Sequence, residues 1–134
     1  LTDLMDRQVA VEGRLIEAPT LWKHDGRYYL FYSANDYATP QYAIGYAVSD
    51  EIFGPYIKPS RQPLLKTDLG QGLVGPGGQD IVRWNDGSEW MVYHGWIADG
   101  RAMFLGRLEW EDGVPVVMHT RHPLTAPSEG DSQA

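Results

Sequence analysis

Cysteine is absent from the sequence, which excludes disulfide bonds, zinc–thiolate sites, iron–sulfur clusters and thiol catalysis. No run of about 18 apolar residues occurs, so the sequence predicts no membrane-spanning helix. Positive charge is scarce: 11 Lys and Arg stand against 18 Asp and Glu, and the net charge is -7. Because phosphate groups repel such a chain, we expect neither nucleic acid nor a membrane among its partners. The absence of cysteine leaves the cellular compartment open.

What the sequence has in abundance is aromatic and turn-forming residues: 5 Trp, 8 Tyr, 15 Gly and 9 Pro among 134 residues. This composition predicts short strands joined by tight turns. Hydrophobic residues make up 43% of the chain, which is enough to fill the core of one domain. The dipeptide Asp25-Gly26 separates two strand-like runs, residues 20–24 and 27–33. It predicts a hairpin, because a type I′ turn requires positive φ at its centre. A third run follows at residues 42–49.

The same pattern recurs 61 residues further on, where Asp86-Gly87 takes the place of Asp25-Gly26. At that offset the runs around residues 29–32 and 44–45 also find counterparts, which indicates two similar up-and-down units. Such units are typical of β-propeller blades, and a generic antiparallel sandwich is the alternative. We therefore expect an all-β fold with two antiparallel, four-stranded blades of a partial propeller. The expected ranges are 1–124 for the domain, about 17–58 and 79–117 for the blades, and 125–134 for a flexible tail.

Two blades are too few for a closed ring, because propellers close with about four to eight blades. A repeat unit also needs neighbours on both sides, and about three units are required for stability. Exposed blade flanks and strand edges favour association with other chains. We therefore expect either a homo-oligomer or a missing N-terminal half.

Glu17 is the first candidate for catalysis. It lies 61 residues before Gly78, and both residues stand just ahead of the first strand of their unit. The first strand of a blade is innermost, so Glu17 is expected to face the central channel, and Pro19 stiffens the backbone there. A carboxylic acid among aromatic rings suits a general acid that protonates a leaving oxygen. A surface glutamate at a strand entrance is the alternative.

The run from Glu17 to Asn35 resembles the general-acid blade of glycoside hydrolase family 43. The similarity continues at residues 42–49, 75–79, 90–96 and 110–117, so it spans about residues 11–117. The resemblance implies a five-bladed β-propeller that releases arabinose or xylose from plant polysaccharides by inversion, with Glu17 as the general acid. We thus expect a glycoside hydrolase for xylosyl or arabinofuranosyl linkages of hemicellulose, and a pentose-containing oligosaccharide as its partner.

The resemblance also implies roles for other residues. His94 matches a histidine near the propeller axis, in a region where many members hold calcium or an ordered water, and Arg101 resembles an arginine of the pocket floor. Many relatives carry His at the position of Gly78. The resemblance therefore implies no required cofactor and leaves calcium at the axis as an alternative. The expected substrate-binding residues are Gln79, His94, Arg101, Trp22 and Trp96.

The general base of the family lies on an earlier blade, upstream of the matched region. Inverting hydrolysis needs a second carboxyl group about 6.5–9.5 Å from the acid. Within this chain Asp80 and Asp36 are the candidate catalytic stand-ins, since Asp80 lies at an inner-strand entrance and Asp36 in a loop, and Glu12 is a third carboxylate to consider. Turn or rim carboxylates are the alternative, so a non-catalytic glycan-binding or structural half-propeller remains the second hypothesis for function.

Overall fold

The computed structural model describes residues 2–60 and 63–119, and the expected tail at residues 125–134 lies outside them. In the described part of the chain, no helix has the length and apolarity to span a bilayer. The strands form two antiparallel sheets, each in sequential order, so the expected all-β, up-and-down class is confirmed. The elements in chain order are α1 (Val9–Glu12), β1 (Ile16–His24), β2 (Arg27–Ala34), β3 (Ala43–Ser49), η1 (Leu69–Gln71), β4 (Gly77–Arg83), β5 (Glu89–Ile97), β6 (Gly100–Glu111) and β7 (Val114–Met118).

The two sheets differ in strand number. The second sheet has the four strands β4–β7, as expected, whereas the first has only β1, β2 and β3. The prediction of a fourth strand is therefore wrong for the first sheet. In the described residues after β3, the backbone pairs with this strand through two isolated bridges, Val48 to Ile57 and Ile44 to Leu65. Prolines interrupt this segment and cannot donate ladder hydrogen bonds. They are Pro55, Pro59 and Pro63.

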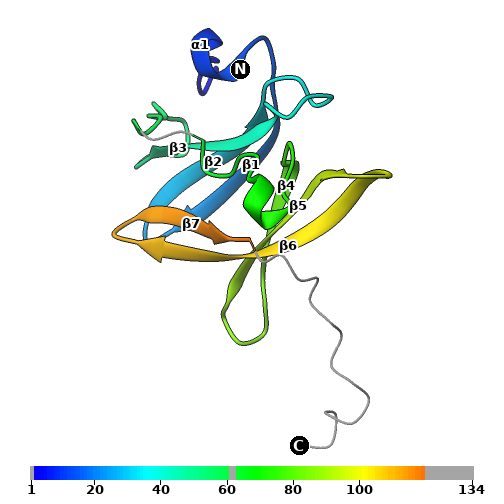
Figure 1. Ribbon diagram of the computed structural model, residues 1–134. Helices are drawn as coiled ribbons and strands as arrows, with labels where there is room; N and C mark the ends of the chain where they lie inside the picture. Colours follow the sequence, from blue (N-terminus) through cyan, green and yellow to red (C-terminus); the bar gives the residue numbers. More distant parts are fainter. Residues whose placement is uncertain (1, 61–62, 120–134) are drawn as a thin grey trace, which may run out of the picture.

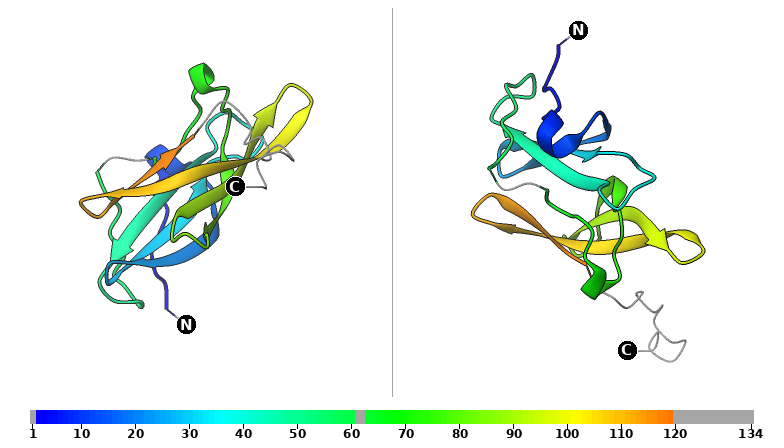
Figure 2. Two further views of the ribbon diagram at one scale, coloured as in Figure 1. Left: turned by 90° about the horizontal axis from the view of Figure 1, so that it is seen from below. Right: turned by 45° about the horizontal axis from the view of Figure 1, so that its top comes forward.

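The two sheets lie face to face as layers, and α1 lies on the side of the first sheet away from the second (Figures 1 and 2). A single hydrophobic core fills the space between them, because the strands of both sheets turn alternate apolar side chains inward. Its buried residues are Tyr29, Phe31, Ile44, Tyr46, Leu65, Leu73, Ile81, Met91, Tyr93 and Leu108. This shared core fixes the two sheets against each other.

The outer faces of the two sheets are covered differently. Leu4 and Met5 of the N-terminal segment pack against Leu30 on the first sheet. Val92 pairs directly with Leu105 on the outer face of the second sheet, which leaves several apolar side chains in contact with solvent. They are Val82 (43% exposed), Val92 (38%), Met103 (80%) and Leu105 (36%). This open face agrees with an association with further blades, and both the blade limits and the oligomeric state remain predictions.

Both Asp-Gly turns connect the first two strands of their sheet, but the two turns differ in length. In the first hairpin His24 pairs with Arg27, so two residues form the turn. In the second, the Trp84 N–H donates to the Ser88 carbonyl at 2.7 Å, which leaves the three residues 85–87 in the turn. The second turn therefore contains one extra residue.

Because of this extra residue, the offset of 61 between the two repeats does not apply to their first strands. Glu17 pairs with Ser33, and Gly77 pairs with His94, which is the counterpart of Ser33. The structural counterpart of Glu17 is thus Gly77, and the expected match with Gly78 is wrong by one residue. The offset of 61 holds from the turn onward and not for the strand that precedes it.

Candidate active site

Glu17 lies at the start of β1, where the pairing with β2 is interrupted by a bulge between Glu17 and Thr20. Ala18 adopts a left-handed conformation there, with φ of 54°, and Pro19 follows. A bulge of this kind turns a side chain away from the regular strand direction. Glu17 is exposed and borders a cavity of about 260 Å³ along the edge strand β1. Its Oε1 accepts a hydrogen bond from the Tyr42 hydroxyl at 2.7 Å.

Tyr42 and His94 form a stacked pair beside Glu17. Their ring centroids are 6.0 Å apart with an interplanar angle of 18°. Two glycines make room for the rings, because a Cβ on Gly77 would lie 2.0 Å from Tyr42 Cε1. A Cβ on Gly78 would lie 2.7 Å from His94 Cδ2 and Nε2, and Gly78 has φ of 62°. Position 78 therefore has no room for a histidine while His94 keeps this place.

Burial and the neighbouring charges set the protonation of the His94 and Tyr42 side chains near neutral pH. Burial, together with the positive charge of Arg101, lowers the pKa of His94, and the opposing effect of Glu17 is smaller. Burial also raises the pKa of Tyr42 to about 12, with contributions from the bond to Glu17. His94 is thus neutral and Tyr42 remains a hydroxyl donor. Among the described residues, His94 Nδ1 is buried without a hydrogen-bond partner.

Arg101 and Trp96 are paired across β5 and β6 and hold the loop between β2 and β3. The Arg101 guanidinium lies 4.5 Å from the Trp96 ring centroid and 5.3 Å from that of Tyr37. The Tyr37 carbonyl accepts hydrogen bonds from Arg101 Nη2 at 3.2 Å and from Trp96 Nε1 at 3.1 Å. Trp96 follows His94 by two residues on β5, and His94 stacks on Tyr42. The structure therefore brings Trp96 and its partner Arg101 to the neighbourhood of Tyr42.

Gln79 lies behind this site and is only 4% exposed. Its Nε2 donates to the Ala18 carbonyl at 2.5 Å, and its Oε1 accepts from the Ser33 hydroxyl at 2.8 Å. The Gln79 carbonyl also accepts from the Thr20 hydroxyl at 2.9 Å. This side chain therefore fixes the bulge next to Glu17 from inside the protein, and its expected contact with substrate remains a prediction.

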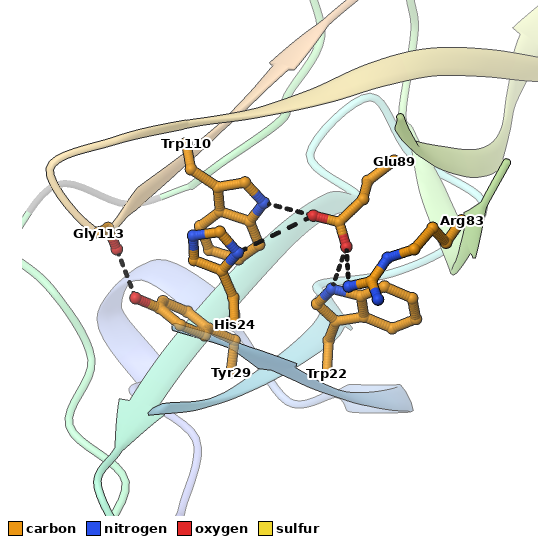
Figure 3. A network of polar contacts seen from close by, with 7 residues as sticks. All are labelled: Trp22, His24, Tyr29, Arg83, Glu89, Trp110 and Gly113. Atoms are coloured by element: carbon orange, nitrogen blue, oxygen red, sulfur yellow. Dashed lines mark hydrogen bonds and ion pairs between the residues drawn. The ribbon is translucent and has the colours of Figure 1, made fainter. Parts of the chain in front are cut away.

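Trp22 is not brought to Glu17. It lies five residues further along β1, beyond the bulge and near the opposite end of the strand. Its Nε1 donates to Glu89 Oε2 at 2.8 Å, within the network of Figure 3. The Glu89 carboxylate also accepts from Trp110 Nε1 at 2.9 Å and from Arg83 Nη2 at 3.1 Å. This arrangement gives Trp22 a role in joining the two sheets.

The three candidate stand-ins for a general base are each engaged by their own surroundings. Asp80 is exposed and its Oδ1 accepts from the Ile81 N–H at 2.8 Å. Asp36 is exposed and its Oδ1 accepts from the Ala38 N–H at 2.9 Å, which forms an Asx turn. Glu12 is buried and ion-paired with Lys58 at 2.9 Å. A catalytic role for Asp80 or Asp36 remains a prediction.

A metal site does not emerge from the described side chains. Within residues 2–60 and 63–119, no group of three or more His, Cys, Asp or Glu side chains is placed to hold a metal ion. A calcium ion at the propeller axis would need ligands besides these side chains. It remains an expectation from the family resemblance.

Sequence reasoning missed Tyr42, which donates directly to the candidate acid. The available signal was the run Gly75-Pro76-Gly77-Gly78, because glycine inside a strand marks a close approach by another group. Nothing in the local pattern around Tyr42 shows that its hydroxyl reaches a residue 25 positions earlier.

Replacing Gly77 by alanine is expected to destabilise the protein by about 1–3 kcal/mol, the usual cost of overpacking. The added methyl group would overlap the Tyr42 ring, which is only 2% exposed and cannot swing into solvent. Denaturant unfolding measures the effect. Gly70→Ala is the control, since its Cβ would meet only Asp68 Oδ1 at 3.4 Å. Equal stabilities for the two variants would contradict the close contact of ring and backbone.

Comparisons with known proteins give consistent results. A family model described as "Glycosyl hydrolases family 43" matches residues 2–115. The chain is 36% identical over 115 residues to the "Extracellular endo-alpha-(1->5)-L-arabinanase 1" of Bacillus subtilis (strain 168), covering 77% of this chain and 34% of that protein. It is 34% identical over 110 residues to a "Xylosidase/arabinosidase" of Butyrivibrio fibrisolvens, covering 75% and 21%.

Solved structures show the same likeness. A thermostable family-43 glycoside hydrolase matches with a TM-score of 0.76 and 40% identity, covering 84% of this chain and 38% of that one. An endo-1,4-beta-xylanase from Bacteroides thetaiotaomicron VPI-5482 matches with a TM-score of 0.76 and 37% identity, covering 84% and 42%. The chain thus spans about a fifth to a third of the length of the curated relatives it matches.

Proposed function

Because this chain belongs to glycosyl hydrolase family 43, we propose that it carries the general-acid part of a glycoside hydrolase site. The proposed substrates are xylosyl or arabinofuranosyl linkages of hemicellulose. The observation that carries the proposal is the exposed Glu17 side chain, whose Oε1 accepts a hydrogen bond from the Tyr42 hydroxyl at 2.7 Å while the Tyr42 ring stacks on His94. The names of the relatives, an arabinanase, a xylosidase/arabinosidase and a xylanase, support the substrate class.

In the proposed reaction Glu17 donates its proton to the oxygen of the leaving sugar as the glycosidic bond breaks. A water molecule attacks the anomeric carbon from the opposite face, and a second carboxylate accepts a proton from that water. In the described part of the chain Arg101 donates one hydrogen bond, to the Tyr37 carbonyl, so its guanidinium retains donors for sugar hydroxyls. The general base is proposed to come from sequence beyond this chain or from a second copy, with Asp80 and Asp36 as local alternatives.

A second candidate function is glycan binding without cleavage. The observation that favours it is the engagement of the three candidate stand-ins Asp36, Asp80 and Glu12 in local contacts. The chain would then hold a pentose-containing oligosaccharide near Arg101 and Trp96, or act as a structural half-propeller.

The test is an assay of the purified chain on unactivated xylo- and arabino-oligosaccharides and on nitrophenyl xyloside and arabinofuranoside, with nitrophenyl glucoside as the control substrate. Calorimetry with the same oligosaccharides measures binding. Release of pentose supports the hydrolase. Binding without release fits either a general base outside this chain or the second candidate. Neither binding nor release contradicts both the hydrolase and the glycan-binding candidate and favours a structural half-propeller.

A further inference from the structure

We propose that Tyr42 is a positioning residue for Glu17, holding one carboxyl oxygen so that the other presents the proton to the leaving group. This inference rests on the proposed function of Glu17. The Tyr42 hydroxyl donates to Glu17 Oε1 at 2.7 Å. The two residues differ in exposure: Tyr42 is 2% exposed, whereas Glu17 lies open to solvent. A rigid, buried donor thus holds a side chain that would otherwise sample several rotamers.

The ring of Tyr42 has little freedom to move. One side lies against the backbone of Gly77, where even a methyl group has no space. It also stacks on His94, which in turn lies against Gly78. The two glycines therefore restrict the positions of the Tyr42 and His94 rings. As a result, the Tyr42 hydroxyl has one position beside Glu17. Catalytic groups gain from such fixed geometry, because small displacements lower the rate strongly.

Tyr42 stands at the end of the loop that follows β2, and this loop is anchored where sugar is expected to bind. The Tyr37 carbonyl in the loop accepts hydrogen bonds from both Arg101 and Trp96. The Tyr42 N–H donates to the Thr39 carbonyl at 3.2 Å, and Thr39 is itself bonded to Asp36. The loop links the candidate binding residues to the donor for Glu17. Asp36 is thereby an organiser of this loop.

The hydroxyl form of Tyr42 persists over the whole range in which an acid catalyst would work. Burial raises the pKa of Tyr42 to about 12, and the bond to Glu17 acts in the same direction. Contacts with Ser33 and Arg101 act against this rise. It follows that removing the Glu17 charge should lower the pKa of Tyr42, which gives a direct probe of the contact.

The first measurement is NMR of the full chain with 13C-labelled tyrosine, followed as a function of pH. In Glu17→Gln we expect ionisation of Tyr42 to begin at lower pH than in the wild type. Tyr56 serves as the internal control, because its hydroxyl donates to the Ile52 carbonyl and not to a carboxylate. An unchanged Tyr42 titration would overturn the proposal, whatever the activity of the chain.

The second measurement compares Tyr42→Phe with Tyr56→Phe, a matched loss of one buried hydroxyl. Tyr42→Phe is expected to lower turnover of unactivated oligosaccharides by about 10- to 100-fold, with a much smaller effect on nitrophenyl substrates, which need little protonation of the leaving group. Tyr56→Phe should leave this ratio unchanged. Equal losses on both substrates in Tyr42→Phe would reduce Tyr42 to a structural role. A shifted Tyr42 titration with neither turnover nor binding of the oligosaccharides would uphold the contact and contradict the proposed function.

Discussion

Replacing Glu17 by glutamine is expected to lower hydrolysis of unactivated xylo- and arabino-oligosaccharides by about 100- to 10,000-fold, the contribution of one acid–base group. The amide keeps the size of the side chain but cannot transfer a proton to the leaving oxygen, because its N–H groups are not acidic. Nitrophenyl substrates have good leaving groups, so their hydrolysis should fall much less. The measurement is pentose release from both substrate types by the wild type and the variant under the same conditions.

The matched control for this variant is Glu51→Gln, which removes an exposed carboxylate in the turn after β3. It changes the net charge by the same amount and should leave both activities unchanged. Turnover that persists in Glu17→Gln on unactivated substrates would remove Glu17 from the mechanism. A loss in Glu51→Gln as well would point to an effect of charge and not of the acid.

Breaking the buried ion pair between Glu12 and Lys58 is expected to destabilise the protein by about 3–5 kcal/mol. The Nζ to Oε2 distance is 2.9 Å, and both side chains are below a tenth exposed. The Tyr32 hydroxyl donates to the other carboxylate oxygen at 2.6 Å. In Lys58→Met the carboxylate loses its cation and remains buried, which carries the penalty. Denaturant unfolding compares it with Arg27→Gln, which breaks an exposed pair with Asp50 and should cost about 1 kcal/mol or less.

The same pair makes the stability depend on pH. Burial of Glu12 acts to raise its pKa, but the hydrogen bonds from Lys58, Tyr32 and the Gln8 N–H outweigh it, so the pKa is lowered below 4.5. A carboxyl group whose pKa is lower in the folded state stabilises the fold above the unfolded pKa. This contribution is lost as the pH falls through the folded value. As the pH falls from about 5 to the folded pKa of Glu12, Lys58→Met should lose less stability than the wild type. Equal losses would contradict the assignment.

The fold class was accessible from the sequence because its signals are local. The two Asp-Gly dipeptides occur at the first turn of each sheet, and the strand-like runs that follow them form β2 and β5. Other details depend on longer range effects. The extra residue in the turn at 85–87 makes Gly77 the structural counterpart of Glu17. Aligning the sequence with itself at one offset does not show this shift in strand register. The edge of the first sheet depends on whether a proline-rich segment can pair at all.

The candidate site was accessible only in part for a similar reason. A motif locates Glu17, His94 and Arg101 along the chain but does not say which side chains meet. Trp22 belongs to β1 as Glu17 does, yet it lies at the other end and binds Glu89. Tyr42 reads as an ordinary strand residue, and its hydroxyl reaches the carboxylate only because the folded first sheet places the chain before β3 two strands away from the start of β1.

The polar contacts between the sheets also determine how the protein unfolds. The Tyr29 hydroxyl donates to the Gly113 carbonyl at 2.6 Å, and Trp22 binds Glu89 across the same gap (Figure 3). Partners so distant in the chain can meet only after both halves have docked, so neither half retains these bonds alone. Contact between remote segments slows folding and makes it more cooperative. Amide hydrogen exchange in β2 and β5 should therefore follow global opening, with the two halves protected to the same degree.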